Sequence, residues 1–358
     1  MIAKKRRMLA EWEPQSAVQL TWPNEGTDWA PILPEITAVY EALAREISKR
    51  EDLLIVAPEH LLPDLSPLTS HILPLTYNDT WARDHGFITV EETSDIRHQT
   101  SDISHQTSDI SHQTSDFRHQ TSDIILLDFK FNGWGEKFPA ELDNQINKHL
   151  YNRGLVKGTY EGHLDFVLEG GSIESDGKGT IFTTTCCLMA PHRNQPLTQQ
   201  EIEHRLKLWL GAKRIVWLNH GSLIGDDTDG HIDTLVRICP DDTLLYTGGD
   251  GDHPDLVEME KELQTLRTLD GRPYRLLKLP LPRPIYDNLQ HDRLPATYAN
   301  YLVINGAVLV PTYRQPDLDA EAMQVIGQAY PNREIVGIDC CAVIQQHGSL
   351  HCCTMQYY

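Results

Sequence analysis

The residues of this chain that are best suited to chemistry gather in four short polar clusters. Each cluster holds carboxylates, histidine or cysteine, the side chains that carry protons, bind cations or attack as nucleophiles. The clusters are YNDTWARDHG at 77–86, LEGGSIE at 168–174, GDDTDGHIDT at 225–234 and HGSLHCC at 347–353. The last cluster fits a metal knuckle, a disulfide, or a nucleophile with a proton donor close by.

The number and spacing of the cysteines favour the third interpretation, a nucleophile, over a disulfide or a metal site. There are seven of them, an odd number that includes three adjacent pairs, which makes a poor disulfide framework. No Cys-x-x-Cys pair occurs, so a structural zinc site is not expected. Most of these cysteines are therefore expected to pack as small hydrophobic residues.

Helices and strands that alternate along the chain must position these clusters. Apolar spacing and capping residues predict five amphipathic helices, at 31–50, 139–154, 198–211, 254–271 and 316–330. Each leads into a short apolar run that predicts a strand, at 53–57, 164–169, 214–218, 275–280 and 334–339. The four polar clusters follow four of these helix-strand pairs. Five similar units predict a closed α/β repeat, in which the clusters converge on one place.

A low-complexity segment interrupts this rhythm between residues 93 and 123. It repeats the heptapeptide TSDISHQ with small changes, and one apolar residue in seven is too sparse for a coiled coil. We expect a flexible or weakly extended insert at the tip of a hairpin, because the flanking runs GFITVEE and IILLDFKF both predict strands. A metal site made by its histidines is the less favoured alternative; these are His98, His105, His112 and His119.

Composition excludes some classes of function. The chain has 358 residues and 40% hydrophobic content, as in a soluble globular protein, and its formal charge is -20. Nucleic-acid binding would need a basic face, so the charge argues against it and weakly favours a cationic ligand. No apolar run approaches a membrane span and no signal sequence is evident, so we expect a cytoplasmic protein. The basic stretch KKRR near the start is interpreted as a solvated tail.

Six ordered motifs carry a resemblance to a known family. They are AEWEPQSAVQLTWP, NDTWARDHG, EGGSIESDGKGTIFTTTCCL, DDTDGHIDTL, ATYANYLVINGAVLVPTY and HGSLHCCTMQ. Together they resemble the agmatine deiminase and bacterial-type peptidylarginine deiminase family of guanidino-group-modifying enzymes. The resemblance implies a five-fold pseudosymmetric α/β propeller (the pentein fold), with residues 1–358 as one deiminase domain and 93–123 as an insert within it.

The same resemblance assigns roles to individual residues. Cys352 matches the nucleophile and His231 the general acid/base. Asp84 and Asp233 match the two carboxylates that grip the guanidinium, and Glu169 matches a further acidic residue beside the histidine. Trp81 matches an aromatic residue that lines the pocket. In the turn formed by Asp226, Asp227 and Asp229, the carboxylates either shape the turn or touch substrate, and Asp227 is the candidate for substrate contact.

The chemistry of a guanidinium agrees with this set of residues. The ion is planar and cationic, so carboxylates bind it through charge-assisted hydrogen bonds, and its resonance-stabilised carbon needs a strong nucleophile such as a thiolate. The resemblance implies a covalent amidino-thioether on Cys352, hydrolysed to a ureido product and ammonia, without a metal or cofactor. The implied substrate is agmatine, which gives N-carbamoylputrescine in polyamine biosynthesis.

Other interpretations stay open from the sequence. Arginine or peptidyl-arginine is the alternative substrate, and a catalytically silent binding propeller is the alternative class. Cys353 competes with Cys352 for the role of nucleophile, but neighbouring residues of a strand face opposite sides, which favours Cys352. His347 and His351 are interpreted as polar neighbours of the turn. The sequence leaves open the roles of Asp79, Arg83 and Asp229, the purpose of the insert, and whether several copies of the chain assemble.

Overall fold

The computed structural model describes residues 4–69, 71–96, 119–287 and 291–358. Within these ranges the strands form five separate sheets. Neighbouring strands are given in order for each sheet. Two sheets have four strands: β1 (Lys4–Met8), β5 (Ile88–Ile96), β6 (His119–Lys130) and β7 (Thr159–Val167) in one, and β17 (Thr354–Tyr357), β2 (Ala17–Thr21), β3 (Asp52–Ala57) and β4 (His71–Pro74) in the other. Three sheets have three strands: β10 (Arg214–Leu218), β9 (Thr180–Thr184) and β8 (Glu174–Ser175); β11 (Val236–Cys239), β12 (Thr243–Thr247) and β13 (Arg275–Leu279); and β14 (Leu302–Ile304), β15 (Ala307–Thr312) and β16 (Glu334–Asp339).

The five sheets share one connectivity. Each contains an antiparallel pair whose second strand also pairs with a parallel strand, as β8–β9–β10 and β17–β2–β3 do. A helix connects the two parallel strands in every case, because parallel neighbours need a crossover. These helices are α1 (Leu33–Ser48), α5 (Asp143–Asn152), α7 (Gln199–Leu210), α8 (Pro254–Thr265) and α9 (Pro316–Ala329). All five predicted helices are therefore confirmed, and the fold is α/β.

The helices begin and end where local chemistry predicts. Helix α1 buries residues spaced three and four apart, from Ile36 to Ile47, so a single apolar face covers its sheet. Helix α7 begins with a capping box between Thr198 and Glu201 and ends at Gly211, which is left-handed. The helix predicted from residue 139 begins only at Asp143, because the preceding residues form a turn.

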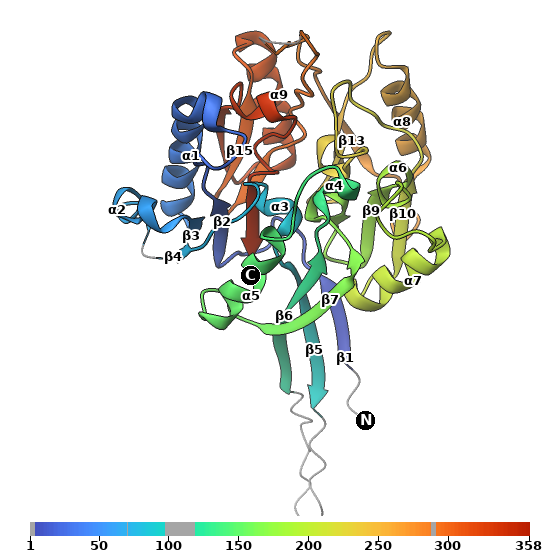
Figure 1. The fold of residues 1–358 in the computed structure, drawn as a ribbon. Coiled ribbons are helices and arrows are strands. Elements are labelled where there is room, and N and C mark those ends of the chain that lie inside the picture. The colour runs from blue at the N-terminus through green and yellow to red at the C-terminus, as the bar shows by residue number, and fades with distance from the viewer. Residues whose placement is uncertain (1–3, 70, 97–118, 288–290) are drawn as a thin grey trace, which may run out of the picture.

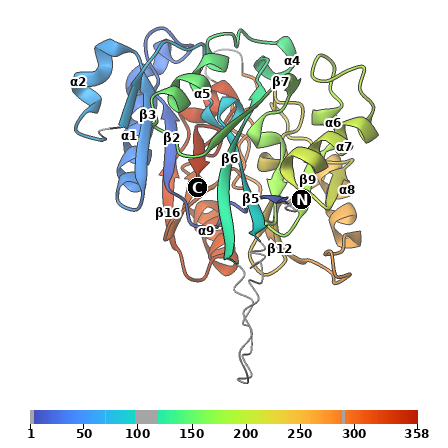
Figure 2. The ribbon, with the colours of Figure 1, turned by 90° about the horizontal axis from the view of Figure 1, so that it is seen from below.

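Crossover helices also contact the neighbouring sheet. Helix α9 packs against β16 and β13, α1 packs against β3 and β16, and α7 packs against β10 and β1. In Figure 2, α1, α9, α8 and α7 lie toward the periphery of the molecule. The described side chains form three hydrophobic clusters between these layers. Each of these three helices therefore packs against two sheets that have no strand in common.

A connecting segment runs from each sheet to the next one along the chain. The connection leaves the last parallel strand and precedes the first strand of the next sheet. Four contain a short helix, namely α3 (Ala82–His85), η3 (Gly170–Ser172), η4 (Ile232–Thr234) and η5 (Val343–Gln346). The fifth follows β13 and reaches β14 without a helix in its described residues. The four predicted polar clusters all lie in these connections.

One prediction about the exterior needs correction. The KKRR stretch is not a solvated tail, because it forms most of β1, which pairs with β5, and Arg6 and Arg7 form ion pairs with glutamates. In the insert at 93–123, residues 93–96 and 119–123 are extended, as expected for the arms of a hairpin, and they continue the antiparallel ladder of β5 and β6. Figure 1 shows this hairpin projecting from the body of the molecule. Residues 97–118, with His98, His105 and His112, lie outside the described residues.

The remaining helices are short. They are η1 (Ala30–Ile32), η2 (Glu59–Leu61), α2 (Leu62–Leu65), α4 (Gly133–Glu136) and α6 (Thr185–Leu188). Among the described residues, no helix is long and apolar enough to cross a membrane.

Candidate active site

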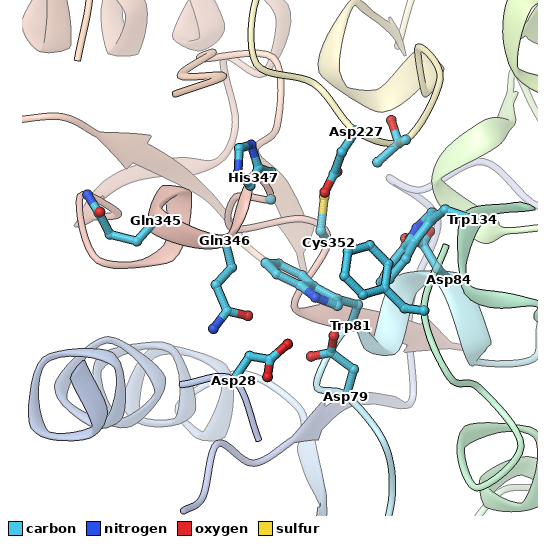
Figure 3. Close-up of a pocket in the computed structure, with 13 residues that line it drawn as sticks. Asp28, Asp79, Trp81, Asp84, Trp134, Asp227, Gln345, Gln346, His347 and Cys352 are labelled. Atoms are coloured by element: carbon cyan, nitrogen blue, oxygen red, sulfur yellow. The ribbon is translucent and has the colours of Figure 1, made fainter. Parts of the chain in front are cut away.

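A cavity of about 220 Å³ opens above Cys352. Four aspartates line it, and the described lining residues include no lysine or arginine. The complete lining is Asp28, Asp79, Trp81, Asp84, Trp134, Phe138, Asp227, Thr228, Gln345, Gln346, His347, Gly348 and Cys352. Figure 3 shows Cys352 beside Trp81, with Asp28 and Asp79 on one side of the indole and Asp227 on the other. The cavity is therefore a negatively lined, aromatic-walled space with a thiol.

Cys352 lies in the turn just before β17, not within the strand as expected. The amide of Asn300 donates to the Cys352 sulfur at 3.3 Å, and its oxygen accepts from the backbone N–H of His351 at 2.9 Å. Burial raises the pKa of the Cys352 thiol well above its ordinary value, and the negative charges of Asp233 and Asp84 raise this pKa further. Both effects favour the protonated form of the thiol.

Cys353 faces away from the cavity. Its thiol lies 3.4 Å from the carbonyl of Ser349, and its side chain packs in the hydrophobic core. Of the two adjacent cysteines, Cys352 is thus the one that the structure exposes to a ligand.

Asp84, on α3, is held by two donors. The indole N–H of Trp134 donates to Oδ2 at 3.0 Å, and the backbone N–H of Gly171 donates to Oδ1 at 3.1 Å. Burial raises the pKa of Asp84 above its ordinary value, against the opposing charge of His231. Trp134 belongs to α4, whose residues 133–136 all have positive φ. Left-handed backbone is strained for Trp134. This conformation orients the indole N–H toward the Asp84 carboxylate.

His231 is fully buried behind the cavity. Its Nδ1 lies 3.7 Å from Asp84 Oδ1, and neither ring nitrogen has a hydrogen-bond partner among the described residues. Burial lowers the pKa of His231, but the charges of Asp84, Cys187 and Glu169 outweigh it and raise the pKa well above its ordinary value. A protonated imidazole with unused N–H groups is suited to give a proton to a leaving group.

Asp233, on η4, is also fully buried. Its Oδ2 accepts from Nδ1 of His351 at 2.7 Å and lies 3.9 Å from the Cys352 sulfur, whereas Oδ1 has no partner among the described residues. Burial alone would raise the pKa of Asp233, but the hydrogen bond and charge of His351 lower it below its ordinary value. Asp233 is therefore an ionised carboxylate with one oxygen free.

Glu169 is held by a buried arginine that the sequence analysis did not single out. Arg193 Nε lies 3.0 Å from Glu169 Oε1, and Arg193 Nη1 donates to Asp229 at 2.6 Å. Lys137 also pairs with Asp229, at 2.9 Å. Asp229 therefore anchors the arginine, and Asp226 shapes the turn by accepting from the N–H of Gly230.

Gly171 marks the point where these groups converge. A Cβ built on Gly171 would lie 2.6 Å from His231 Nδ1, 3.0 Å from Asp233 Oδ2 and 3.0 Å from Asp84 Oδ1. Any larger residue would fill the space between the three side chains. Gly171 therefore allows the backbone to approach these groups closely, and the space it leaves is enclosed by two carboxylates and an imidazole.

The remaining predicted residues form the walls of the cavity. Trp81 packs against Gly348, where a Cβ would lie 2.2 Å from the ring. Asp227 lines the cavity, and burial raises its pKa while His347 opposes the shift. Burial raises the pKa of Asp79 to about 7. Arg83 points away from the cavity, and its backbone N–H donates to the carbonyl of Cys352 at 3.2 Å.

The structure thus separates the predicted residues into two layers. Trp81, Asp84, Asp227 and Cys352 line the cavity, while Glu169, His231 and Asp233 lie behind it. Asn300 was missed, although it follows the strand at 275–279 as the other clusters follow theirs, and this phase in the repeat was the available signal. Trp134 and Arg193 had no such signal, because their roles depend on distant partners.

Among the described residues, two groups of side chains have the spacing of metal ligands. They are Glu169 with Cys187 and His231, and Glu11 with Glu174 and His351. Arg193 already pairs with Glu169, and Arg237 pairs with both Glu11 and Glu174. An arginine thus supplies the positive charge in each group, and neither group calls for a metal in the chemistry considered below.

Comparison with known proteins agrees with this geometry. A family model described as Porphyromonas-type peptidyl-arginine deiminase matches residues 7–357. The agmatine deiminase of Pseudomonas aeruginosa strain LESB58 is 28% identical over 380 residues, covering 98% of this chain and 95% of the relative. A cysteine-to-serine variant of the agmatine deiminase of C. jejuni, solved with substrate bound, is 32% identical with a TM-score of 0.85, covering 99% of this chain and 97% of that one. A solved protein of Porphyromonas gingivalis, provisionally named an arginine deiminase, is 45% identical with a TM-score of 0.84, covering 99% and 98%.

Proposed function

Because this chain belongs to the Porphyromonas-type peptidyl-arginine deiminase family, we propose that it hydrolyses the guanidino group of agmatine to N-carbamoylputrescine and ammonia. Two of the relatives above are named agmatine deiminases, and each matches nearly the whole chain. One observation carries the choice of agmatine. The cavity around Cys352 is lined by four aspartates and by no described lysine or arginine.

The charge of the cavity distinguishes the substrates. Agmatine is cationic at both ends, so the guanidinium and the distal amine both suit carboxylates. Free arginine adds an α-carboxylate, which would enter an acidic cavity without a cationic partner and would be repelled. Asp227 is the proposed contact for the distal end, and the Trp81 face suits a cation.

In the proposed reaction, Asp84 and Asp233 hold the guanidinium with its carbon over Cys352. The substrate cation offsets the negative charges that raise the pKa of the thiol, so the thiol releases its proton to water and becomes a thiolate when substrate binds. The thiolate adds to the carbon, and His231 protonates one amino group, which leaves as ammonia. Neutral His231 then takes a proton from water as the water adds to the amidino-thioether. Collapse of this adduct breaks the carbon–sulfur bond, passes the hydroxyl proton of the adduct to the departing sulfur, and releases the neutral ureido product. Glu169 supports the charge of His231.

We extend the proposal to the architecture and the location of the protein. The five sheets are arranged as the five-fold pseudosymmetric propeller that the family resemblance implies, and residues 1–358 form one domain. Support comes from the shared connectivity, the helices that contact two sheets, and the pairing of the last strand with β2. A cytoplasmic location stays a prediction.

The proposed function is tested by colorimetric detection of ureido groups with purified protein on agmatine, free arginine and an arginine-containing peptide. We expect kcat/KM for agmatine to exceed that for arginine at least a hundredfold. In Asp227→Asn, KM for agmatine should rise more than tenfold while kcat changes only a few-fold. Turnover of arginine or the peptide at or above the agmatine rate would replace agmatine as substrate, and a lack of turnover on all three would support a silent binding protein.

A further inference from the structure

The two oxygens of Asp233 have different surroundings. Oδ2 receives the Nδ1–H of His351 at 2.7 Å, while Oδ1 is buried without a partner among the described residues. Because an ionised carboxylate only accepts hydrogen bonds, the proton of this bond belongs to His351 Nδ1. The bond therefore decides which oxygen of Asp233 stays free.

His351 is itself fixed by a buried charge network. Its Nε2 lies 3.1 Å from Glu11 Oε2 and 3.2 Å from Nη2 of Arg237. Arg237 pairs with Glu11 and Glu174 and stacks over the ring of Tyr301, with its Cζ 4.4 Å from the ring centroid. Imidazole, guanidinium and carboxylates thus brace one another in a site with almost no water contact.

His351 does not reach the substrate cavity. It lines a separate cavity of about 50 Å³ on the other side of this network, together with Glu11, Arg83 and Glu174. The route from His351 to substrate therefore passes through Asp233. A histidine that was only a polar neighbour of the turn would not be expected to contact charged groups at both ring nitrogens.

We propose that His351 is a positioning residue of the deimination proposed above, whose Nδ1–H binds Asp233 Oδ2 and so leaves Oδ1 free to accept from the guanidinium. Glu11 and Arg237 hold the imidazole in this orientation from behind. Without the bond, Asp233 would turn either oxygen toward the cavity and would lose a donor that favours its charged form. The guanidinium would then be held less well over Cys352, and both its affinity and its orientation would suffer.

Two amide substitutions at His351 distinguish the contact made by Nδ1 from the contacts made by Nε2. In His351→Asn the amide nitrogen lies near the position of Nδ1, so it can still donate to Asp233. In His351→Gln the nitrogen lies near the position of Nε2, so it keeps the contact with Glu11 and loses the one with Asp233. Both variants are polar and smaller than or close to histidine in size, and thermal melting checks their folding.

The test measures how well the site recognises a planar cation, independently of turnover. The rate of Cys352 alkylation by chloroacetamidine is compared with the rate for chloroacetamide, its neutral analogue. We expect wild type to prefer the amidine, His351→Asn to keep that preference within threefold, and His351→Gln to lose at least tenfold. With agmatine, kcat/KM should fall less than tenfold in His351→Asn and more than a hundredfold in His351→Gln, with part of the loss in kcat.

The possible results separate this inference from the proposed function. Equal loss in both variants, or an unchanged preference in His351→Gln, overturns the positioning role while guanidino recognition stands. A wild-type enzyme that shows no preference for the amidine overturns both. If neither His351 variant folds, Glu11→Gln is measured instead; a fall in its amidine preference supports the role, and an unchanged preference overturns it.

Discussion

At the scale of single residues, the site is poised for a cation before one arrives. Cys352 lies beside Asp233 and close to Asp84, and these negative charges together with burial keep its thiol protonated. His231 is held in the opposite state, as a buried imidazolium. In the proposed reaction, a bound guanidinium offsets the two carboxylates, so the substrate itself activates the nucleophile.

The adjacent cysteines provide a matched pair of substitutions. Cys352→Ser should abolish deimination with little change in melting temperature, because the hydroxyl is a far weaker nucleophile of similar size. Cys353→Ser should keep turnover within a few-fold, although its buried hydroxyl costs about 1 kcal/mol in the free energy of unfolding. Steady-state kinetics and thermal melts check both, and activity lost in Cys353→Ser but not in Cys352→Ser would reverse the assignment.

The pKa of Cys352 makes a prediction with a clear sign. Because its neighbours raise the thiol pKa, the midpoint of the pH profile for alkylation by neutral iodoacetamide should lie well above the midpoint of an unperturbed cysteine, which is ~8.5. Removing the charge in Asp233→Asn should shift the midpoint to lower pH and speed alkylation at pH 7.5. The same variant should lose deiminase turnover by more than a hundredfold, because the grip on the guanidinium is broken. A midpoint that moves upward would contradict the electrostatic account.

At the scale of elements, the site depends on connections between sheets more than on the sheets themselves. The connections after β4, β7, β10, β13 and β16 bring Asp84, Glu169, His231, Asn300 and Cys352 to one place. Each belongs to a different sheet, so the rigid strands fix where a connection starts and ends while its sequence is free to carry function. The β5–β6 hairpin is different, because its far end extends away from the site (Figure 1).

Shortening this hairpin tests whether the heptapeptide repeats are passive. The last described ladder pair is Ile96 with His119, so residues 97–118 can be replaced by Asn-Gly, a favoured two-residue turn. We expect melting temperature and kcat/KM to stay within experimental error, since β1 and β7 already flank the hairpin. Steady-state kinetics check this, and a large rise in KM in a folded variant would show instead that the repeats act on the cavity.

At the scale of the whole molecule, the last strand of the chain pairs with its second strand. Strand β17 pairs with β2, with Thr354 opposite Leu20 and Tyr357 opposite Ala17. Glu11 accepts from the backbone N–H of Val303 and from the side chain of Gln356, so the N-terminal segment also joins distant parts of the chain. In the proposed propeller, this pairing closes the circle of sheets and holds Cys352 in place.

Removing the last strand tests this closure. Deletion of residues 354–358 keeps every proposed catalytic residue but removes β17, including the buried Met355 and Tyr357. The loss of buried apolar area and ladder hydrogen bonds should exceed the net stability of a typical domain, about 5–15 kcal/mol. We expect no cooperative thermal unfolding and no turnover, whereas deletion of Tyr358 alone should behave like wild type. A folded, active protein without residues 354–358 would show that the site does not need the closing strand.

Local sequence patterns were enough to predict the crossover helices and the kinds of side chain available for chemistry. Apolar spacing of three and four residues and capping residues such as Thr198 and Gly211 are local signals, so all five crossover helices were predictable. The four clusters of carboxylate, histidine and cysteine were visible for the same reason, as was their common phase after a helix and a strand. Through the family resemblance, they pointed to a guanidino substrate and to Cys352.

The contacts that each of these residues makes depend on the tertiary structure and could not be predicted from local patterns. The KKRR stretch is a strand because its ladder partners lie more than 80 residues away in β5. Asn300, Trp134 and Arg193 matter through Cys352, Asp84 and Glu169, which lie 52, 50 and 24 residues from them in the chain. His351 was predicted to be a polar neighbour of a turn, whereas the structure pairs it with Asp233. A side chain's type is local, but its orientation, burial and charge environment arise from segments that meet only when the chain folds.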